Sequence, residues 1–418
     1  MSERSVLGHP SSANRASVFP DLLRTLKPSS AANGISRRAL AIAGTILLLC
    51  VPIAFAQFNP TLSIDEDCQT FAISLENQIV YSVPHMRRVQ HRIVERDELW
   101  ITPIDRKPKM KRILDPDKFM PIPPPSSYTI DSLAWSPNGH FIAMGMTTLK
   151  PAEETEASEE IGNEQHPAKK PKEQKRKENR GNLGPVAPPV IGKQVVLLDN
   201  EGHEIKVAGS KGRFIENGMR PAWLADNSSV VYLTGGGPYQ IVRVRPSNGT
   251  SKTLFDGHAL DAIVWDTPRN RAFAIGSSLS PSGHRSLVEL DLLHETVREI
   301  ARADAYKGGL AISLSGDKIG YFADGDTVTV LDVAHPENAT HLQIGYGRFE
   351  WGKDDKHILL KRGTDDQSND LLWIGVYDGS FTPILHDLTF DDFHISPNGD
   401  WLAVTQPGKR AMQVYSLR

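Results

Sequence analysis

Several side chains in this chain are of types that perform acid–base, phosphate or metal chemistry, but their spacing does not suit those reactions. Carboxylates recur in short polar stretches, at Asp226, Asp317, Asp354, Asp355 and Asp400. Each stands between two apolar runs among Ser, Asn, Gly and Lys, which indicates a role in a turn rather than a general acid–base pair. The sequence contains no G-x-S-x-G, H-E-x-x-H or paired C-x-x-C motif.

Two further stretches resemble ligand-binding motifs without completing them. Residues 347–354, GRFEWGKD, approach a phosphate-binding loop, but Asp354 stands where Ser or Thr is needed to reach Mg²⁺. The glycine-rich residues 234–240 fit a hairpin connection. His85 and His91 are near enough in sequence to suggest a metal pair, although a long solvated hairpin suits them better. We therefore predict no catalytic residue, no cofactor and no metal ligand.

The tetrapeptide Ser-Pro-Asn-Gly occurs twice, each time between two apolar runs. Its residues are Ser136, Pro137, Asn138, Gly139 and Ser396, Pro397, Asn398, Gly399. Pro presets φ, Asn tolerates unusual backbone angles and Gly supplies positive φ, so each copy predicts a tight turn between two strands.

Aligning the chain on these turns reveals an internal repeat of about 40–45 residues. The position just before the turn is occupied by Ile73, Trp135, Trp223, Trp265, Ile312, Trp351 and Ile395. Two more short runs rich in Val, Ile and Leu follow each turn, and such runs favour strands. After Gln57 no long stretch has the 3.6-residue period of a helix.

Seven such units of four strands predict an all-β fold, a seven-bladed β-propeller of four-stranded antiparallel blades. The last unit ends at Arg418 after three strands. The stretch FNPTLSI, residues 58–64, is predicted to supply the missing strand and so to remove an exposed edge. Six blades, or two separate β-domains, remain alternatives.

The repeated units resemble the TolB-like, WD40-like repeats known as PD40, in which an apolar or aromatic residue precedes Ser-Pro-Asp/Asn-Gly and an apolar strand. Only the units around Ser136 and Ser396 carry the full motif, and Trp-Asp occurs once, at 265–266. The resemblance covers most of residues 58–418. It implies the propeller and a cell-envelope setting, but no particular function.

The first 56 residues have the parts of an export signal. Arg37 and Arg38 precede the apolar residues 39–56, and Ala54 and Ala56 form a small-x-small site before Gln57. Cleavage there would leave residues 57–418 as the propeller, exported to the periplasm or the extracellular space. An uncleaved inner-membrane anchor is the alternative, since 18 apolar residues are about the shortest span. The paired Arg leave open whether the twin-arginine or the general secretory route is used.

The charge balance argues against a nucleic-acid surface. Residues 1–56 hold six Lys or Arg and two Asp or Glu, so residues 57–418 hold 41 basic and 48 acidic residues, a net charge of −7. Cys68 is the one cysteine of this part, so no internal disulfide can form. Residues 150–193 are acidic, then basic, and nearly free of large apolar residues. We predict a disordered charged insertion there, within the second unit.

These features predict a monomeric, exported propeller that binds a protein partner or a cell-envelope component and catalyses no reaction. The alternative is a carbohydrate-binding propeller, or one of the hydrolase or lyase type, with a site at the mouth of its channel. Nucleic acid is not an expected partner, and contact with a membrane is expected only through an uncleaved N-terminal anchor.

Overall fold

The computed structural model describes most of the chain after residue 58. The described residues are 59–89, 92–119, 126–149, 152–153, 190–208, 214–235, 238–277, 283–363, 369–388, 390, 392–406 and 411–418. They belong to one compact unit, Phe58–Arg418. The predicted signal or anchor, with Ala54, Ala56 and Gln57, lies outside the described residues. Within them, no helix is long and apolar enough to cross a bilayer.

Five sheets of the described chain have four strands each, and in four of them the strands follow one another in sequence. These four are β11 (Gly218–Trp223), β12 (Val230–Thr234), β13 (Tyr239–Arg245) and β14 (Thr250–His258); β15 (Leu260–Asp266), β16 (Arg271–Gly276), β17 (Ser286–Asp291) and β18 (Thr296–Arg302); β19 (Tyr306–Ile312), β20 (Lys318–Ala323), β21 (Thr327–Asp332) and β22 (Thr340–Gln343); and β23 (Gly347–Trp351), β24 (His357–Gly363), β25 (Asn369–Gly375) and β26 (Phe381–Leu388). A short 3₁₀ helix, η1 (Thr267–Arg269), joins β15 to β16.

The fifth four-stranded sheet combines the two ends of the described chain. It contains β27 (Asp392–Ile395), β28 (Trp401–Gln406), β29 (Ala411–Ser416) and the N-terminal β1 (Leu62–Ile64), and β1 pairs with β29. Leu62 lies opposite Val414 and Ile64 opposite Met412, and the Thr61 amide donates to the Val414 carbonyl at 2.7 Å. The N-terminal strand therefore completes the last sheet, as its sequence predicts.

The remaining strands form one nine-stranded sheet. They are β2 (Phe71–Ile73), β3 (Gln78–Val89), β4 (Arg92–Pro103), β5 (Lys111–Leu114), β6 (Ser127–Trp135), β7 (Phe141–Leu149), β8 (Ala152–Glu153), β9 (Val190–Asp199) and β10 (Ile215–Glu216). The expected seven separate four-stranded blades are thereby corrected: the structure has five, and the first two repeat units share this sheet.

The physical reason for the joined sheet is the length of β4. This strand has 12 residues, and its extension reaches β6, where Arg96 and Tyr128 form a single parallel pair. The Tyr128 hydroxyl donates to the Asp97 carbonyl at 3.0 Å, and the Ile130 amide donates to Asp97 Oδ2 at 2.7 Å. Burial raises the pKa of Asp97 to about 7, with a smaller contribution from the nearby Glu95 and Asp131. Side-chain and backbone bonds thus bind the two units where the parallel pair forms.

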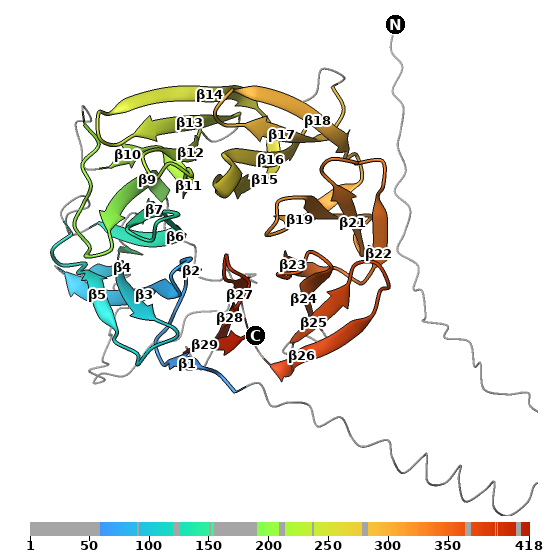
Figure 1. Ribbon diagram of the computed structural model, residues 1–418. Coiled ribbons are helices and arrows are strands. Elements are labelled where there is room, and N and C mark those ends of the chain that lie inside the picture. Colours follow the sequence, from blue (N-terminus) through green and yellow to red (C-terminus); the bar gives the residue numbers. More distant parts are fainter. Residues whose placement is uncertain are drawn as a thin grey trace, which may run out of the picture. The chain divides into compact units, whose positions relative to one another are not determined.

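The sheets lie side by side around a ring, with one strand of each repeat unit innermost (Figure 1). The innermost strands are β2, β6, β11, β15, β19, β23 and β27. Buried apolar side chains fill the spaces between neighbouring units. One such cluster joins Phe322 and Val328 to Phe349 and Ile358, and similar clusters join the other successive units. Successive side chains of a strand point to opposite faces of its sheet, so each sheet packs against one neighbour on either face.

The turn after each innermost strand has the same backbone. Each turn contains one residue in the left-handed backbone conformation. It lies four positions after the last residue before the turn, or five positions in the unit that contains η1. The seven residues are Asn77, Gly139, Asn227, Asn270, Gly316, Asp355 and Gly399, with φ between 51° and 78°. Only Gly, Asn and Asp occur there, because the left-handed conformation is costly for residues with larger side chains.

Where the left-handed residue is Asn or Asp, its side chain accepts a hydrogen bond from the preceding unit. The Asn138 amide donates to Asn227 Oδ1 at 2.9 Å, and the Ala225 amide to Asn270 Oδ1 at 3.0 Å. At the closure of the ring, Asn77 Oδ1 accepts from the Trp401 indole. These turns therefore both reverse the chain and connect one repeat unit to the next.

The two Ser-Pro-Asn-Gly copies form the same turn. The Ser136 hydroxyl donates to Asn138 Oδ1 at 2.7 Å and accepts from the Phe141 amide at 2.9 Å. In the second copy, the Ser396 hydroxyl donates to Asn398 Oδ1 at 2.6 Å and accepts from the amide five residues on at 2.9 Å. The serine thus stabilises the turn from inside in both copies.

Strand structure extends into both ends of the predicted disordered insertion, 150–193. Ala152–Glu153 pairs with β4, and β9 begins at Val190 and pairs with β7. Antiparallel pairing with a neighbouring strand supplies the hydrogen bonds that a solvated loop would take from water. The residues between these two strands lie outside the described part of the chain.

Asn77 gives a test of ring closure. Asn77→Ala puts alanine, which tolerates the left-handed conformation less well than asparagine, at φ 57°. It also removes the oxygen that accepts the hydrogen bond of the Trp401 indole. We expect the free energy of unfolding to fall by about 2–3 kcal/mol. Asn77→Gly loses the acceptor but keeps the backbone conformation, so its loss should be about 1 kcal/mol smaller. Urea unfolding of both variants measures this, and an Asn77→Ala variant as stable as the original chain would contradict the role assigned to this turn.

Candidate functional site: the channel wall

The seven residues just before the turns, here called the anchor residues, lie at the ends of the innermost strands. Six of them are the final residues of β2, β6, β11, β19, β23 and β27, and Trp265 is the penultimate residue of β15. Three of the tryptophans donate their indole N–H to the preceding innermost strand: Trp135 to the Ala72 carbonyl, Trp265 to Arg220 and Trp351 to Ala311, at 3.1–3.2 Å. These three tryptophans therefore connect neighbouring sheets.

The position just before each anchor distinguishes two of the units from the others. Five units have a small residue there: Ala72, Ala134, Ala222, Val264 and Ala311. The last two have Glu350 and His394 instead. These two side chains meet, with His394 Nδ1 at 2.7 Å from Glu350 Oε1. A polar pair thus replaces small apolar residues on one part of the channel wall.

Arg348 and Asp392 extend this pair to a cluster of four charged or titratable side chains. Arg348 Nη2 lies 3.0 Å from Glu350 Oε1, and Arg348 Nη1 forms an ion pair with Asp392 Oδ1. His394 Nε2 lies 3.7 Å from Asp392 Oδ2. The second oxygen of Glu350 accepts from the Ile395 amide at 2.7 Å. Each carboxylate therefore faces a basic side chain and also accepts a hydrogen bond.

The regular pairing of β23 and β27 explains why these side chains face the same way. Neither strand has a register shift against its neighbour, so residues two apart share a face. Arg348 and Glu350 therefore lie on one face of β23, while Phe349 and Trp351 are buried on the other. The innermost strands β6, β11, β15 and β19 each have a register shift, which interrupts that alternation.

Opposing effects act on the acidity of Glu350. Burial favours the neutral acid, but His394, Arg348 and the Ile395 amide together hold the pKa of this carboxyl below its usual range. The imidazole of His394 also packs edge-on against Phe71, with ring centroids 4.9 Å apart. The imidazole is thus held between the first unit and the last.

Three cavities lie along the innermost strands of the described chain. One of about 360 Å³ is lined by Phe71, Asp392 and His394 among others, and one of about 430 Å³ by Arg348 and Glu350. Both are lined by Ile395, so the charged cluster lies between them. A third, of about 410 Å³, shares Asp131 and Ser132 with the first. The channel wall therefore offers a continuous series of hollows.

The charged groups of the cluster are paired with one another. Its two carboxylates are opposed by Arg348 and His394, and the pKa of Glu350 is lowered. Among the described residues, no group of three or more His, Cys, Asp or Glu is arranged to hold a metal ion. His85, considered for a metal pair from its sequence, lies 3.6 Å from Glu98 on the neighbouring strand.

The sequence reasoning missed all four members of the cluster. The signal that could have found them is present in the aligned repeats, where Glu350 and His394 replace Ala or Val. Since these two units are consecutive, their equivalent positions had to be neighbours in a ring. The turn carboxylates, in contrast, act as turn residues: Asp226 and Asp354 each accept backbone amide bonds within their own turn.

Comparison with known proteins supports the fold alone. No family model matches the chain, and no curated protein matches it. Among solved structures, it is similar to the β-propeller domain of Cps50 (Swd1) from Myceliophteria thermophila, with 10% sequence identity and a TM-score of 0.52. The match covers 86% of this chain and 100% of that domain. The chain is therefore a β-propeller built from four-stranded antiparallel blades.

Glu350→Gln tests the charged cluster through its pH dependence. Because the folded-state pKa of Glu350 is lowered, its contribution is fully present above the unfolded value near 4.5 and is lost as the pH falls below that value. We expect the variant to be less stable than the original chain by about 1.5–3 kcal/mol at pH 7, with the gap narrowing towards pH 3.

Urea unfolding across this pH range measures the gap. Glu337→Gln is a matched control, since Glu337 lies 3.5 Å from His335 but both side chains are about two-thirds exposed. An exposed pair of this kind contributes little, so the control should change stability by less than about 0.5 kcal/mol at every pH. A gap for Glu350→Gln that does not change with pH would contradict an ionised Glu350 in the folded protein.

Proposed function

We propose that this protein is an exported, non-enzymatic β-propeller that binds a protein partner or another cell-envelope component through one rim of its ring. The rim in question, here called the variable rim, is the end at which the innermost strands begin. Antiparallel pairing places Ser127, at the start of β6, opposite Leu149, at the end of β7, so the connections between second and third strands also lie there. The opposite end, called the turn rim, carries the left-handed turns.

The observation that carries the proposal is the contrast between these two rims. On the turn rim, all seven turns have the same left-handed residue and contact their neighbours closely. On the variable rim, β3 and β4 extend as a hairpin of two 12-residue strands, and 40 residues separate the end of β7 at Leu149 from the start of β9 at Val190. Loops that connect the strands of a rigid scaffold are where binding residues concentrate.

We also propose that the nine-stranded sheet holds two repeat units, divided at its single parallel pair. Two observations support this division. Each of the two halves is antiparallel, as the other sheets are, and a buried apolar cluster containing Val80 and Met144 lies between them. The identical turns at Ser136 and Ser396 further support membership of the TolB-like, PD40 repeat family. An experimental structure in which β4 and β6 pair along their full length would contradict the division.

A photo-crosslinking pair tests the binding face. Tyr346 is 61% exposed and directly precedes β23 on the variable rim, whereas the exposed Asp317 lies in a turn of the turn rim. We expect a photoreactive residue at 346 in the full-length chain to give cross-links to a protein or envelope component in intact cells. The matched residue at 317 should give at least about fivefold fewer, because the regular turn rim offers no irregular connections for a partner. Equal yields, or adducts from 317 alone, would contradict the proposal.

The polar pair in the channel supports a second candidate, a carbohydrate-binding or hydrolase-type propeller. Glu350 and His394 lie between two cavities, an arrangement in which a sugar hydroxyl could replace one of the existing bonds. Titration with neutral oligosaccharides separates the two candidates. Saturable sugar binding that is abolished in Glu350→Gln would favour the carbohydrate-binding or hydrolase-type propeller. No sugar binding, together with cross-links at position 346, would favour the partner-binding propeller.

Export is part of the proposal and rests on the N-terminal sequence. If Ala54 and Ala56 mark a cleavage site, the mature protein begins at Gln57. Intact mass of the protein recovered from the producing cells tests this directly. A full-length chain retained in the membrane fraction would support the uncleaved anchor instead.

A further inference from the structure

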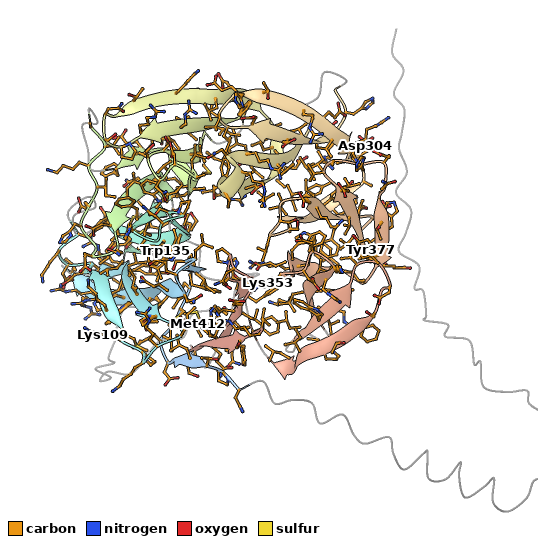
Figure 2. The ribbon with its side chains drawn as sticks, in the orientation of Figure 1. Lys109, Trp135, Asp304, Lys353, Tyr377 and Met412 are labelled. Atoms are coloured by element: carbon orange, nitrogen blue, oxygen red, sulfur yellow. The ribbon has the colours of Figure 1, made fainter. Side chains whose placement is uncertain are left out.

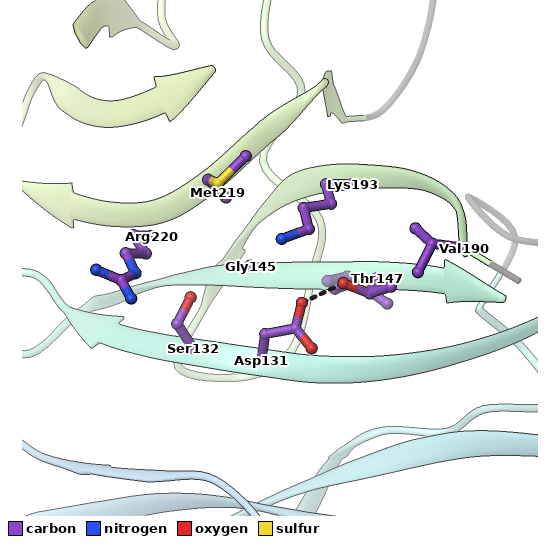
Figure 3. Close-up of a pocket in the computed structure, with 9 residues that line it drawn as sticks. Asp131, Ser132, Gly145, Thr147, Val190, Lys193, Met219 and Arg220 are labelled. Carbon is purple, nitrogen blue, oxygen red and sulfur yellow. Dashed lines mark hydrogen bonds between the residues drawn. The ribbon is translucent and has the colours of Figure 1, made fainter. Parts of the chain in front are cut away.

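A cavity between β6, β7, β9 and β11 has a set of side chains that neither the fold nor the channel cluster uses. Its volume is about 410 Å³. Lys193 and Arg220 enter it from β9 and β11, while Asp131 and Ser132 face them from β6 (Figure 3). Trp135, the last residue of the same strand β6, is labelled in the view with side chains (Figure 2).

The two basic side chains have no acidic partner among the described residues. Neither Lys193 nor Arg220 lies within ion-pair distance of a described carboxylate, whereas Arg285 and Arg348 are paired with Asp261 and Glu350. Asp131 forms an ion pair with neither of them in the described chain; its oxygens accept from Thr147 and, at 3.3 Å, from Thr129. The cavity therefore holds two positive charges and one negative charge, a net charge of +1.

Ser132 contributes an unused hydroxyl. Its Oγ is buried and forms no hydrogen bond with any described residue. It can occupy this place only because residue 145 is glycine, since a Cβ there would lie 2.4 Å from the oxygen. A buried hydroxyl without a partner costs free energy, so packing alone does not account for this side of the cavity.

The backbone is also distorted on both sides of the cavity. β6 shifts its register between Ile130 and Ser132, and β11 shifts between Met219 and Ala222. Arg220, within the second shift, has φ +48° and is the one described left-handed residue with a basic side chain. Bulges redirect side chains, and a strained residue persists where its position is used.

We propose that this cavity binds a small organic carboxylate, with its charged group between Lys193 and Arg220 and a hydroxyl or ammonium donor facing Asp131. A single carboxylate matches the net charge of +1, whereas a phosphate dianion would exceed it. Met146, Met219 and Val190 also line the cavity and suit an apolar body on the ligand. This cavity reaches the variable rim, where β9 begins at Val190, but Tyr346 does not line it, so loss of the cross-links at 346 would not affect binding of the carboxylate.

Mandelate and phenylacetate are a matched pair of probes for this site. Both carry one carboxylate and a phenyl ring, and they differ by the hydroxyl that would face Asp131. Calorimetric titration of the full-length chain at low salt should show mandelate binding about tenfold tighter than phenylacetate. Asp131→Ala should reduce mandelate to the level of phenylacetate.

The cationic side chains are tested without loss of folding. Arg220→Gly removes the guanidinium and relieves the left-handed strain, so it should weaken both probes at least tenfold while the urea midpoint stays equal or rises. Lys193→Gln should also weaken both, and Lys206→Gln, an exposed lysine beyond the cavity, should leave both unchanged. The proposal is overturned if mandelate shows no saturable binding to the original chain, or binds Arg220→Gly and Lys193→Gln as tightly as the original chain.

Discussion

The closure of the ring between the first and last units is the interaction on which the other features depend. β1 supplies the outer strand that the last unit lacks, and Asn77 accepts the indole N–H of Trp401 and the side-chain amide of Asn398. These contacts join residues more than 320 positions apart in the chain. Without them, the apolar faces of β2 and β28, which include Ile73 and Trp401, would be open to water, and the outer edge of β29 would be exposed.

Ring closure also creates the channel and its chemistry. Glu350 and His394 occupy equivalent positions in consecutive units, so the rotation from one unit to the next brings them within 2.7 Å. The same geometry places His394 against Phe71 of the first unit. The cavity beside Arg220 arises differently, from register shifts that turn side chains out of the regular alternation. Strands without a register shift therefore build the ion-pair cluster, and strands with one build the cavity, whose two cations have no acidic partner in the described part of the chain.

The sequence allowed the prediction of the repeat, the anchor positions and the turns, because each rests on local residue preferences. Positive φ in the turns demands Gly, Asn or Asp, and strands of Val and Ile alternate with them. The joined nine-stranded sheet could not be predicted, since it depends on a single backbone pair between Arg96 and Tyr128. The cluster around Glu350 was missed because the alignment of the repeat units considered only the residue types that the units have in common. The two residues that differ from the shared pattern, Glu350 and His394, were the informative ones.

The sequence by itself determined the unit: four short strands, one left-handed turn and one aromatic or branched anchor, repeated around residues such as Trp135 and Trp351. These features depend on local residue preferences, so they do not depend on where the segment lies in the fold. The tertiary structure decided which units touch and which side chains meet. The distances between strands, which only packing sets, decide that Arg348 pairs with Asp392. They also decide that Lys193 and Arg220 line a cavity without a described acidic partner. Electrostatic energies vary steeply with such distances, so they cannot be read from the order of residues.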